Sequence, residues 1–225
     1  MINHNSYGCC SSCHGWLALI VYHTSDSPVS QVAHYKAGDV TWTRIDARTL
    51  LSDVIYYKGQ FLAVTSSDGL LSVNVNSDPA TTTWCIRTTR ASPSHTMTHY
   101  SLVESSREDL LLVEKSYSRS WDLAYKMWCA YGDDGGAQWV EIEGIGTDAL
   151  FLDWNVSMSV SALDFPECRP NSIYFLDYVD WFPQVRVFDL ENGNVEKVCV
   201  LHDPSEECLL PEPKRTGIWI LPTMV

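Results

Sequence analysis

Short strand-like runs rich in apolar residues recur along the chain, and polar turn residues separate them. The clearest unit reads SDVIYYKGQFLAVTSSDGLLSVNV, with apolar-rich runs at residues 54–57, 61–65 and 70–75. Lys58-Gly59 and Ser67-Asp68-Gly69 lie between these runs and are typical of tight turns between strands. No segment keeps a helical period of 3.6 residues over three turns. The pattern therefore predicts an all-β fold built from consecutive hairpins.

Two further units follow the same pattern. The second has strands expected at residues 100–104, 110–115, 126–131 and 138–142, with an exposed loop at residues 116–123. The third runs through ALFLDW, SIYFLDY, QVRVFDLENG and NVEKV, where Glu191-Asn192-Gly193-Asn194 supplies a hairpin turn. Each unit therefore has three or four strands.

A short sequence pattern occurs twice in the chain. Trp42 precedes the run DVIY at Asp53 much as Trp139 precedes the run DALF at Asp148. Repeated meanders of this size predict a partial or small β-propeller of roughly four antiparallel blades, with the recurrent Trp packed between neighbouring sheets. A β-sandwich is the alternative all-β architecture.

Charge and hydropathy limit the partners and the cellular location expected for this protein. The 15 Lys and Arg against 28 Asp and Glu give a formal charge of -13, which repels phosphate backbones, so no nucleic-acid partner is expected. The longest apolar run, residues 16–22, is far shorter than the roughly 20 residues that span a bilayer. The first residues, MINHNSYGCC, lack the features of a secretory signal. We therefore expect a soluble protein of the cytoplasm or nucleus, with no membrane association.

Several sequence blocks occur in an order that resembles a known plant family. Between residues 32 and 225 these blocks are GDVTWTRID, SDVIYYKGQFLAV with DGLLSV, HYSLVESS with DLLLVEK, GTDALFLDWNVSMSVSALDFP, CRPNSIYFLDY, VRVFDLENG and GIWILP. They resemble the plant F-box-associated domain of unknown function, also described as a kelch-like propeller. Members commonly carry an N-terminal F-box, which docks on the Skp-type adaptor of a cullin ubiquitin ligase. The resemblance implies a domain that captures the protein to be ubiquitinated.

The chain departs from this family pattern at its start. The leucine-rich F-box helices are absent, and SSCHGWLALI, which looks like the family's SS-x-GWL block, lies almost directly before GDVTW. We therefore interpret residues 1–31 as a short N-terminal segment left from an earlier blade. Residues 32–225 are the F-box-associated β-propeller-like domain, truncated and without its F-box, so direct binding to the Skp-type adaptor is not expected. Such a shortened propeller closes at small size, stays open or pairs with another chain.

Cysteine and histidine residues near the N-terminus are the main candidates for metal chemistry. Residues 10–14, CSSCH, have the C-x-x-C-H spacing of covalently bound haem, but haem attachment needs an export route and no export signal is present. Cys9, Cys10, Cys13 and His14 offer four zinc ligands, although four ligands within six residues surround a zinc ion poorly. A metal-binding protein stays a weak alternative, and we expect no cofactor.

A short acidic motif resembles a catalytic hairpin. Residues 131–134, YGDD, match the hairpin whose carboxylates hold metal ions in RNA polymerases. The further carboxylate motif and the basic template channel of such enzymes are missing. We interpret the motif as an acidic turn between two strands, and we expect no enzymatic activity.

Aromatic residues in loops and at strand ends are the remaining candidates for function. Propellers present loops at the two ends of a central channel, and aromatic side chains there contribute strongly to protein binding. The candidate partner-binding residues are Tyr117, Trp121, Trp154, Tyr178, Trp181 and Phe182. For Trp154 and Trp181, packing between blades is the alternative.

These observations favour a non-catalytic protein-protein interaction domain. It resembles the substrate-recognition part of plant SCF ubiquitin-ligase F-box proteins, and we expect a protein partner. Because the F-box is absent, the domain could act as a decoy or competitor for the target of a longer relative. The alternative hypothesis is a structural remnant without a partner.

Overall fold

The computed structural model describes residues 3–12, 15–23, 29–87, 97–120, 122–133, 136–153, 157–179 and 182–200. Side chains are described for residues 18–22, 29–87, 98–120, 122–132, 136–153, 157–177 and 184–198. These ranges contain seventeen strands and no helix, which confirms the all-β prediction. It follows that no helix within them has the length and hydrophobicity to cross a membrane.

The strands form four sheets, each built from consecutive segments of the chain. The first sheet contains, in spatial order, β1 (Asn3–Ser12), β2 (Gly15–His23), β3 (Gln31–Lys36) and β4 (Thr43–Ile45). The second contains β5 (Leu51–Tyr57), β6 (Gln60–Thr65), β7 (Leu70–Asn74) and β8 (Thr81–Ile86). The third contains β12 (Gly136–Ile142), β11 (Leu123–Asp133), β10 (Leu110–Tyr117) and β9 (Met97–Glu104). The fourth contains β14 (Ser157–Ser161), β13 (Asp148–Leu152), β15 (Ser172–Val179), β16 (Phe182–Asp189) and β17 (Val195–Val200).

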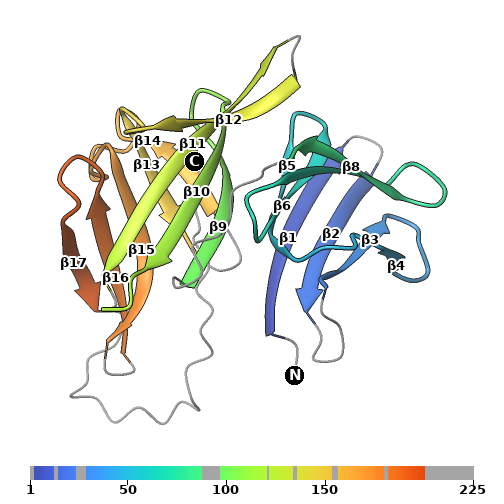
Figure 1. The fold of residues 1–225 in the computed structure, drawn as a ribbon, viewed down its shortest axis with the longest axis horizontal. Helices are drawn as coiled ribbons and strands as arrows, with labels where there is room; N and C mark the ends of the chain where they lie inside the picture. Colours follow the sequence, from blue (N-terminus) through green and yellow to red (C-terminus); the bar gives the residue numbers. More distant parts are fainter. Residues whose placement is uncertain are drawn as a thin grey trace. The chain divides into compact units, whose positions relative to one another are not determined.

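The arrangement of the sheets fits a β-propeller. The first three sheets are meanders in which each strand pairs with the strand before it. Their first strands lie side by side, because β5 lies next to both β1 and β9 (Figure 1). Successive sheets that meet along their first strands are typical of propeller blades. The described strands therefore fit the predicted propeller of about four blades, and they form four small sheets where a β-sandwich would have two large ones.

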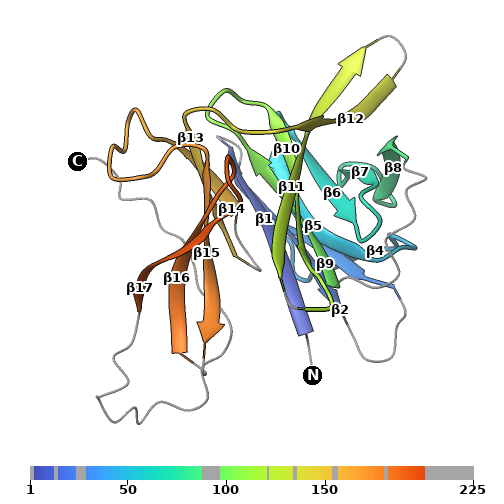
Figure 2. The same cartoon turned by 60° about the vertical axis from the view of Figure 1, so that its left-hand side comes forward.

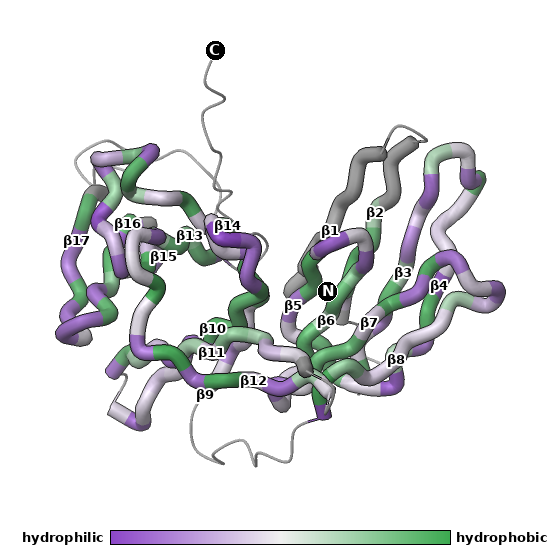
Figure 3. The backbone as a smooth tube through the Cα atoms, turned by 90° about the horizontal axis from the view of Figure 1, so that it is seen from above, coloured by the Kyte–Doolittle hydropathy of each residue, from purple (hydrophilic) through white to green (hydrophobic). Residues whose placement is uncertain are grey.

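Two hydrophobic layers hold the first three sheets together. Phe61 and Ala63 of β6 belong to the layer between the first and second sheets, whereas Leu62 and Val64 belong to the layer between the second and third. Side chains alternate between the two faces of a strand, so β6 is buried on both faces. This explains why its sequence is a continuous apolar run, seen as a green segment in Figure 3.

The fourth sheet differs from the predicted antiparallel blade. β13 pairs with β14 in an antiparallel hairpin, but its other neighbour is β15, which runs parallel to it. The connection at residues 162–171 therefore returns the chain past β14 to the far side of β13. The chain divides into two compact units: residues 1–104 with 109–142, and residues 105–108 with 143–225.

Two buried aspartates, Asp53 and Asp148, begin the two similar apolar runs DVIY and DALF. The Asp53 carboxylate accepts hydrogen bonds from the backbone N–H groups of Val54 (2.7 Å) and Leu102 (2.8 Å), so it links β5 to β9. The Asp148 carboxylate accepts one from the backbone N–H of Ser106 (2.9 Å) and others from the hydroxyls of Ser106 (2.5 Å) and Ser159 (2.9 Å). Each Asp therefore fixes a neighbouring segment to its own strand.

The strands predicted in the three units are present. The runs at residues 54–57, 61–65 and 70–75 correspond to β5, β6 and β7, and the predicted turn at residues 191–194 joins β16 to β17. The three units did not include the first sheet, nor β8 and β14, whose segments TTT and SMS are rich in small polar residues that hide the strand pattern. The expected loop at residues 116–123 is shorter, because Ser116 and Tyr117 pair with Ala124 and Leu123.

The N-terminal segment joins the first sheet. β1 and β2 form a hairpin, and β2 also pairs with β3, so the first sheet continues across residue 31. The interpretation of residues 1–31 as the remainder of an earlier blade concerns the origin of this segment and stays a prediction.

Candidate functional site

The aromatic residues predicted to bind a partner are only partly described. Tyr117 is the last residue of β10, and it is half-buried with Lys115 Nζ 5.5 Å from its ring centre. This distance is within the range of a cation–π contact, so the ring already has a polar neighbour. Trp121, Trp154 and Trp181 lie outside the described residues.

Tyr178 and Phe182 lie on the backbone of one hairpin in the fourth sheet. Tyr178 pairs with Pro183, and Val179 pairs with Phe182 at the end of the β15–β16 ladder. The last residue of β13 pairs with Phe175, so these two positions lie beyond the end of β13. Their side chains are outside the described part of the structure. The topology therefore brings two of the six predicted positions together.

The predicted metal ligands are described only through the backbone of β1. Cys9 and Cys10 lie in this strand, opposite Ala18 and Leu17, whereas Cys13 and His14 lie outside the described residues. In the part of the chain that has described side chains, no group of three His, Cys, Asp or Glu residues is placed to hold a metal ion. The metal alternative therefore stays untested.

The β3–β4 hairpin carries a tightly built turn. The Asp39 backbone N–H donates to the Lys36 carbonyl (2.9 Å), and the Asp39 carboxylate accepts from the Lys36 N–H (2.8 Å). Gly38 has a φ of 97°, which glycine adopts without strain. The Tyr35 hydroxyl donates to the Asp39 carbonyl (2.6 Å), so a side chain from β3 also holds the turn. Three hydrogen bonds thus fix the conformation of residues 36–39, and Gly38 supplies the positive φ that the turn requires.

Exposed apolar side chains follow this turn directly. Val40 is 95% exposed and Trp42 is 46% exposed. The Trp42 ring lies against Tyr35 at 5.6 Å between centroids and an angle of 49°. Trp42 therefore contacts its own sheet and solvent, and the expectation that it packs between neighbouring sheets was wrong. We name Tyr35, Val40 and Trp42 the hairpin patch.

Charged residues of both signs follow the hairpin patch along the chain. Arg44, on β4, donates a hydrogen bond to the Gln31 side chain, and Arg48 lies 3.1 Å from the Asp46 carboxylate. Both members of the Arg48–Asp46 pair are largely exposed, so solvent weakens their attraction.

Trp139 takes the position that the sequence predicted for it. It packs with Ala130 against the hydrophobic layer between the second and third sheets. Its indole N–H donates to the Asp68 carbonyl at 2.8 Å. Trp84 lies close to Gly69 in the same turn, where a Cβ would be 2.7 Å from Trp84 Cζ3. Two Trp side chains therefore contact the β6–β7 turn.

The sequence did not predict the hairpin patch, because the exposure of Trp42 depends on the arrangement of the strands. A Trp beside Thr and Arg in a strand-like run, as in TWTRI, is read as a buried core residue. Its exposure follows from the shortness of β4, which has three residues and begins directly after Trp42. The sequence signal that was available is the order Gly-Asp-Val-Thr-Trp, a turn followed at once by large apolar residues.

The fold and these surfaces define the chain as a propeller domain with exposed aromatic hairpins. Comparison of its sequence with known families gives a match over residues 15–202 to the family described as the KIB1-4 beta-propeller. The chain belongs to this family. No solved structure matches it.

The curated relatives are plant F-box proteins. The F-box protein At2g17690 of Arabidopsis thaliana is 38% identical over 63 residues, which are 28% of this chain and 14% of the relative. The probable F-box protein At1g65740 of the same plant is 34% identical over 70 residues, or 31% of this chain and 18% of the relative. The putative F-box protein At3g25750, also from Arabidopsis thaliana, is 25% identical over 170 residues, or 71% of this chain and 45% of the relative. The chain therefore spans less than half the length of these relatives.

Proposed function

We propose that this chain is a non-catalytic protein-recognition domain, in which the hairpin patch of Tyr35, Val40 and Trp42 contacts the partner. The observation that carries the proposal is the exposure of Val40 and Trp42 next to a turn fixed by three hydrogen bonds. Membership of a propeller family with plant F-box relatives supports a role in protein interaction.

The geometry of the patch favours binding for two physical reasons. Trp and Tyr side chains bury large areas on binding while losing little conformational entropy. A turn that is already ordered also reduces the entropy lost when the partner binds. Because Tyr35 holds both the turn and the Trp42 ring, the patch presents one arrangement to its partner.

The finer part of the proposal comes from the F-box relatives. We propose that the domain, a kelch-like propeller, captures a target protein in the cytoplasm or nucleus, as the substrate-recognition part of a ubiquitin ligase does. Residues 1–225, tested as they stand, are expected to bind this target and not the Skp-type adaptor. A chain with these two properties acts as a decoy or competitor.

The six aromatic positions from the sequence are further candidate contact residues in this proposal, each considered within its own unit of the chain. Tyr117 ends β10, and Tyr178 and Phe182 lie together on the β15–β16 hairpin. Trp121, Trp154 and Trp181 belong to the same proposal. Strand ends and loops of this kind are where propellers commonly bind proteins.

Affinity capture from plant tissue extract tests the proposed function. Immobilised residues 1–225 are expected to recover a recurrent protein, and Trp42→Ala with Val40→Ser to weaken its binding about 30-fold, the effect of losing about 2 kcal/mol at a binding hot spot. Leu163→Ser is the matched control, because Leu163 is an exposed apolar residue outside the patch. The purified adaptor is added to the same assay and is expected not to bind.

Two outcomes would contradict the proposal. Robust adaptor binding by residues 1–225 would overturn the decoy role, and equal loss in the patch variant and Leu163→Ser would overturn the role of the patch. A chain that neither captures a protein nor shows a cooperative thermal transition by circular dichroism would support the structural-remnant hypothesis.

A further inference from the structure

The β11–β12 hairpin extends beyond the rest of the third sheet. β10 pairs with β11 only as far as Leu111 and Cys129, whereas β11 and β12 remain paired out to Asp133 and Gly136. The two strands therefore form a two-stranded extension, visible at the top of Figure 2. We name residues 129–133 and 136–142 the β-arm.

One face of the β-arm is anchored to the second sheet. Ala130 and Trp139, which are paired residues, pack against the layer that contains Leu70 and Ile86. The hydrogen bond from Trp139 Nε1 to the Asp68 carbonyl fixes the same face. The base of the β-arm is therefore held in position, so a partner does not have to order it on binding.

The opposite face of the β-arm is exposed to solvent, and its outer strand β12 lies close to β8 without pairing with it. Tyr131 is 56% exposed and Val140 is 43% exposed. Tyr131 pairs with Gln138 and Cys129 pairs with Val140, so Tyr131 and Val140 are diagonal neighbours on one face. Among the described strands β12 pairs only with β11, because it is the outer strand of its sheet. The outer backbone edge of β12 therefore has no partner strand among the described residues.

The charge of the β-arm has one sign. The β-arm contains Asp133 and Glu141 and no Lys or Arg, in a chain of formal charge -13. Glu141 is exposed and pairs with Trp128, so it lies on the face opposite to Val140. Edge strands that avoid pairing commonly carry Lys or Pro, and the β-arm carries neither. An edge strand with an apolar pair on one face and a carboxylate on the other is complementary to an extended segment in which apolar and basic residues alternate.

We propose that β12 is the docking edge for an extended, basic segment of the partner protein. The segment adds to β12 as a further strand, with an aliphatic side chain against Tyr131 and Val140. Its Lys or Arg side chains lie beside the acidic residues of the β-arm. This inference rests on the proposed protein-recognition function and specifies the chemistry of the partner.

Fluorescence anisotropy with a defined probe tests this inference. The probe is a labelled octapeptide of alternating Lys and Val, and its controls carry Glu in place of Lys or Pro in place of two Val residues. The intact chain is expected to bind the Lys-Val peptide, more weakly at high salt, and to bind neither control. The Pro control separates strand addition from simple charge attraction.

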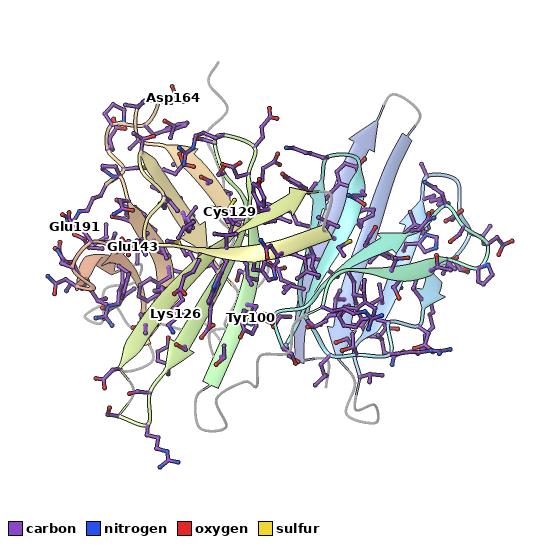
Figure 4. All side chains as sticks on the ribbon, turned by 45° about the horizontal axis from the view of Figure 1, so that its top comes forward. Tyr100, Lys126, Cys129, Glu143, Asp164 and Glu191 are labelled. Atoms are coloured by element: carbon purple, nitrogen blue, oxygen red, sulfur yellow. The ribbon has the colours of Figure 1, made fainter. Side chains whose placement is uncertain are left out.

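Matched variants locate the binding edge. Glu141→Lys, and Tyr131→Ser with Val140→Ser, are expected to weaken peptide binding about tenfold, which is a moderate interface loss. The controls are Glu191→Lys, in the exposed β16–β17 turn labelled in Figure 4, and Val198→Ser on β17, where Val198 is 51% exposed. Both controls are expected to bind within about twofold of the unchanged chain. Circular dichroism melts of all variants show that they fold.

The results separate this inference from the proposed function. Equal losses in the β-arm variants and their controls, or tight binding of the Glu peptide, would overturn the docking edge. Light scattering that shows a dimer disrupted by Val140→Ser would assign the edge to a second copy of the chain instead. If capture from extract succeeds while the Lys-Val peptide does not bind, the inference fails and the proposed function stands.

Discussion

At the scale of single residues, two buried aspartates explain why the runs DVIY and DALF both begin with Asp. Asp53 and Asp148 each lie at the start of an apolar run, where a carboxylate would be costly to bury without partners. The structure supplies backbone N–H donors to both, from Leu102 and Ser106. The sequence could locate these residues, but their partners lie more than 40 positions away and could not be predicted.

Replacing Asp148 is expected to destabilise the fold. Asp148→Ala removes an acceptor of three hydrogen bonds and leaves the Ser106 N–H and two hydroxyls without it. Because hydrogen bonds to charged groups contribute about 1.5–3 kcal/mol each, we expect a loss of about 3 kcal/mol in the free energy of unfolding. Urea denaturation measures it, and Asp164→Ala, at an exposed position, is expected to change little.

The pH dependence of stability is expected to report on His34. This side chain is buried on β3, and its Nδ1 makes no hydrogen bond to a described residue. Burial lowers the pKa of His34 below its usual 6.5, and the nearby Lys36 lowers it further, while Asp39 raises it. The unfolded chain therefore takes up this proton first as the pH falls.

The sign follows from proton binding. Above about pH 6.5 His34 is neutral in both states and contributes no pH dependence. As the pH falls below this value, stability is lost until the pH passes the lower pKa of the folded state. Thermal melts across this range should show a smaller acid loss in His34→Gln than in the unchanged chain. An identical acid loss in both would contradict the assignment.

At the scale of elements, hairpins were the predictable part of the fold. The strands β5, β6 and β7 are flanked by turn residues with positive φ, such as Lys58, Gly59 and Asp68, so their ends are marked in the sequence. β8 and β14 carry short polar side chains and depend on their neighbours for pairing. The parallel β13–β15 pair has no turn signal at all, because its strands are not joined by a hairpin.

The candidate surfaces were less predictable than the strands. Trp42 and Trp139 occupy similar sequence contexts, yet one is exposed at a hairpin end and the other packs between sheets. The difference arises because the β-arm reaches the β6–β7 turn, which gives Trp139 a carbonyl partner at Asp68. Such contacts depend on the arrangement of sheets and leave no local pattern.

The β6–β7 turn requires glycine at position 69. In Gly69→Ala the new Cβ would lie 2.7 Å from Trp84 Cζ3 and 3.2 Å from Thr65 Oγ1, so the Trp84 ring would have to move. We expect a loss of about 1–3 kcal/mol, as is usual for overpacking. Chemical denaturation measures it, with Gly132→Ala as the control, since a Cβ there meets no atom within 4 Å. Equal effects in the two variants would contradict this role of Trp84.

At the scale of the whole molecule, the sequence predicted the number of sheets better than their connections. Turn signals separated residues 54–200 into three units, which correspond to the second, third and fourth sheets, and the second and third are simple meanders as predicted. The position of β15 depends on which edge of the β13–β14 hairpin is free, and this is decided by packing. The net charge of -13 also acts at this scale, since it favours basic partners for any exposed edge.

The parallel pair in the fourth sheet has a consequence for the order of folding during synthesis. In the first three sheets every strand meets a partner made just before it, so each hairpin can form as soon as its second strand leaves the ribosome. β15 must instead pass β14 and pair with β13. The entropy cost of closing the intervening loop therefore arises before the contacts that offset it have formed. The fourth sheet is therefore expected to be the slowest of the four described sheets to assemble, although its strands are the last of these to be made.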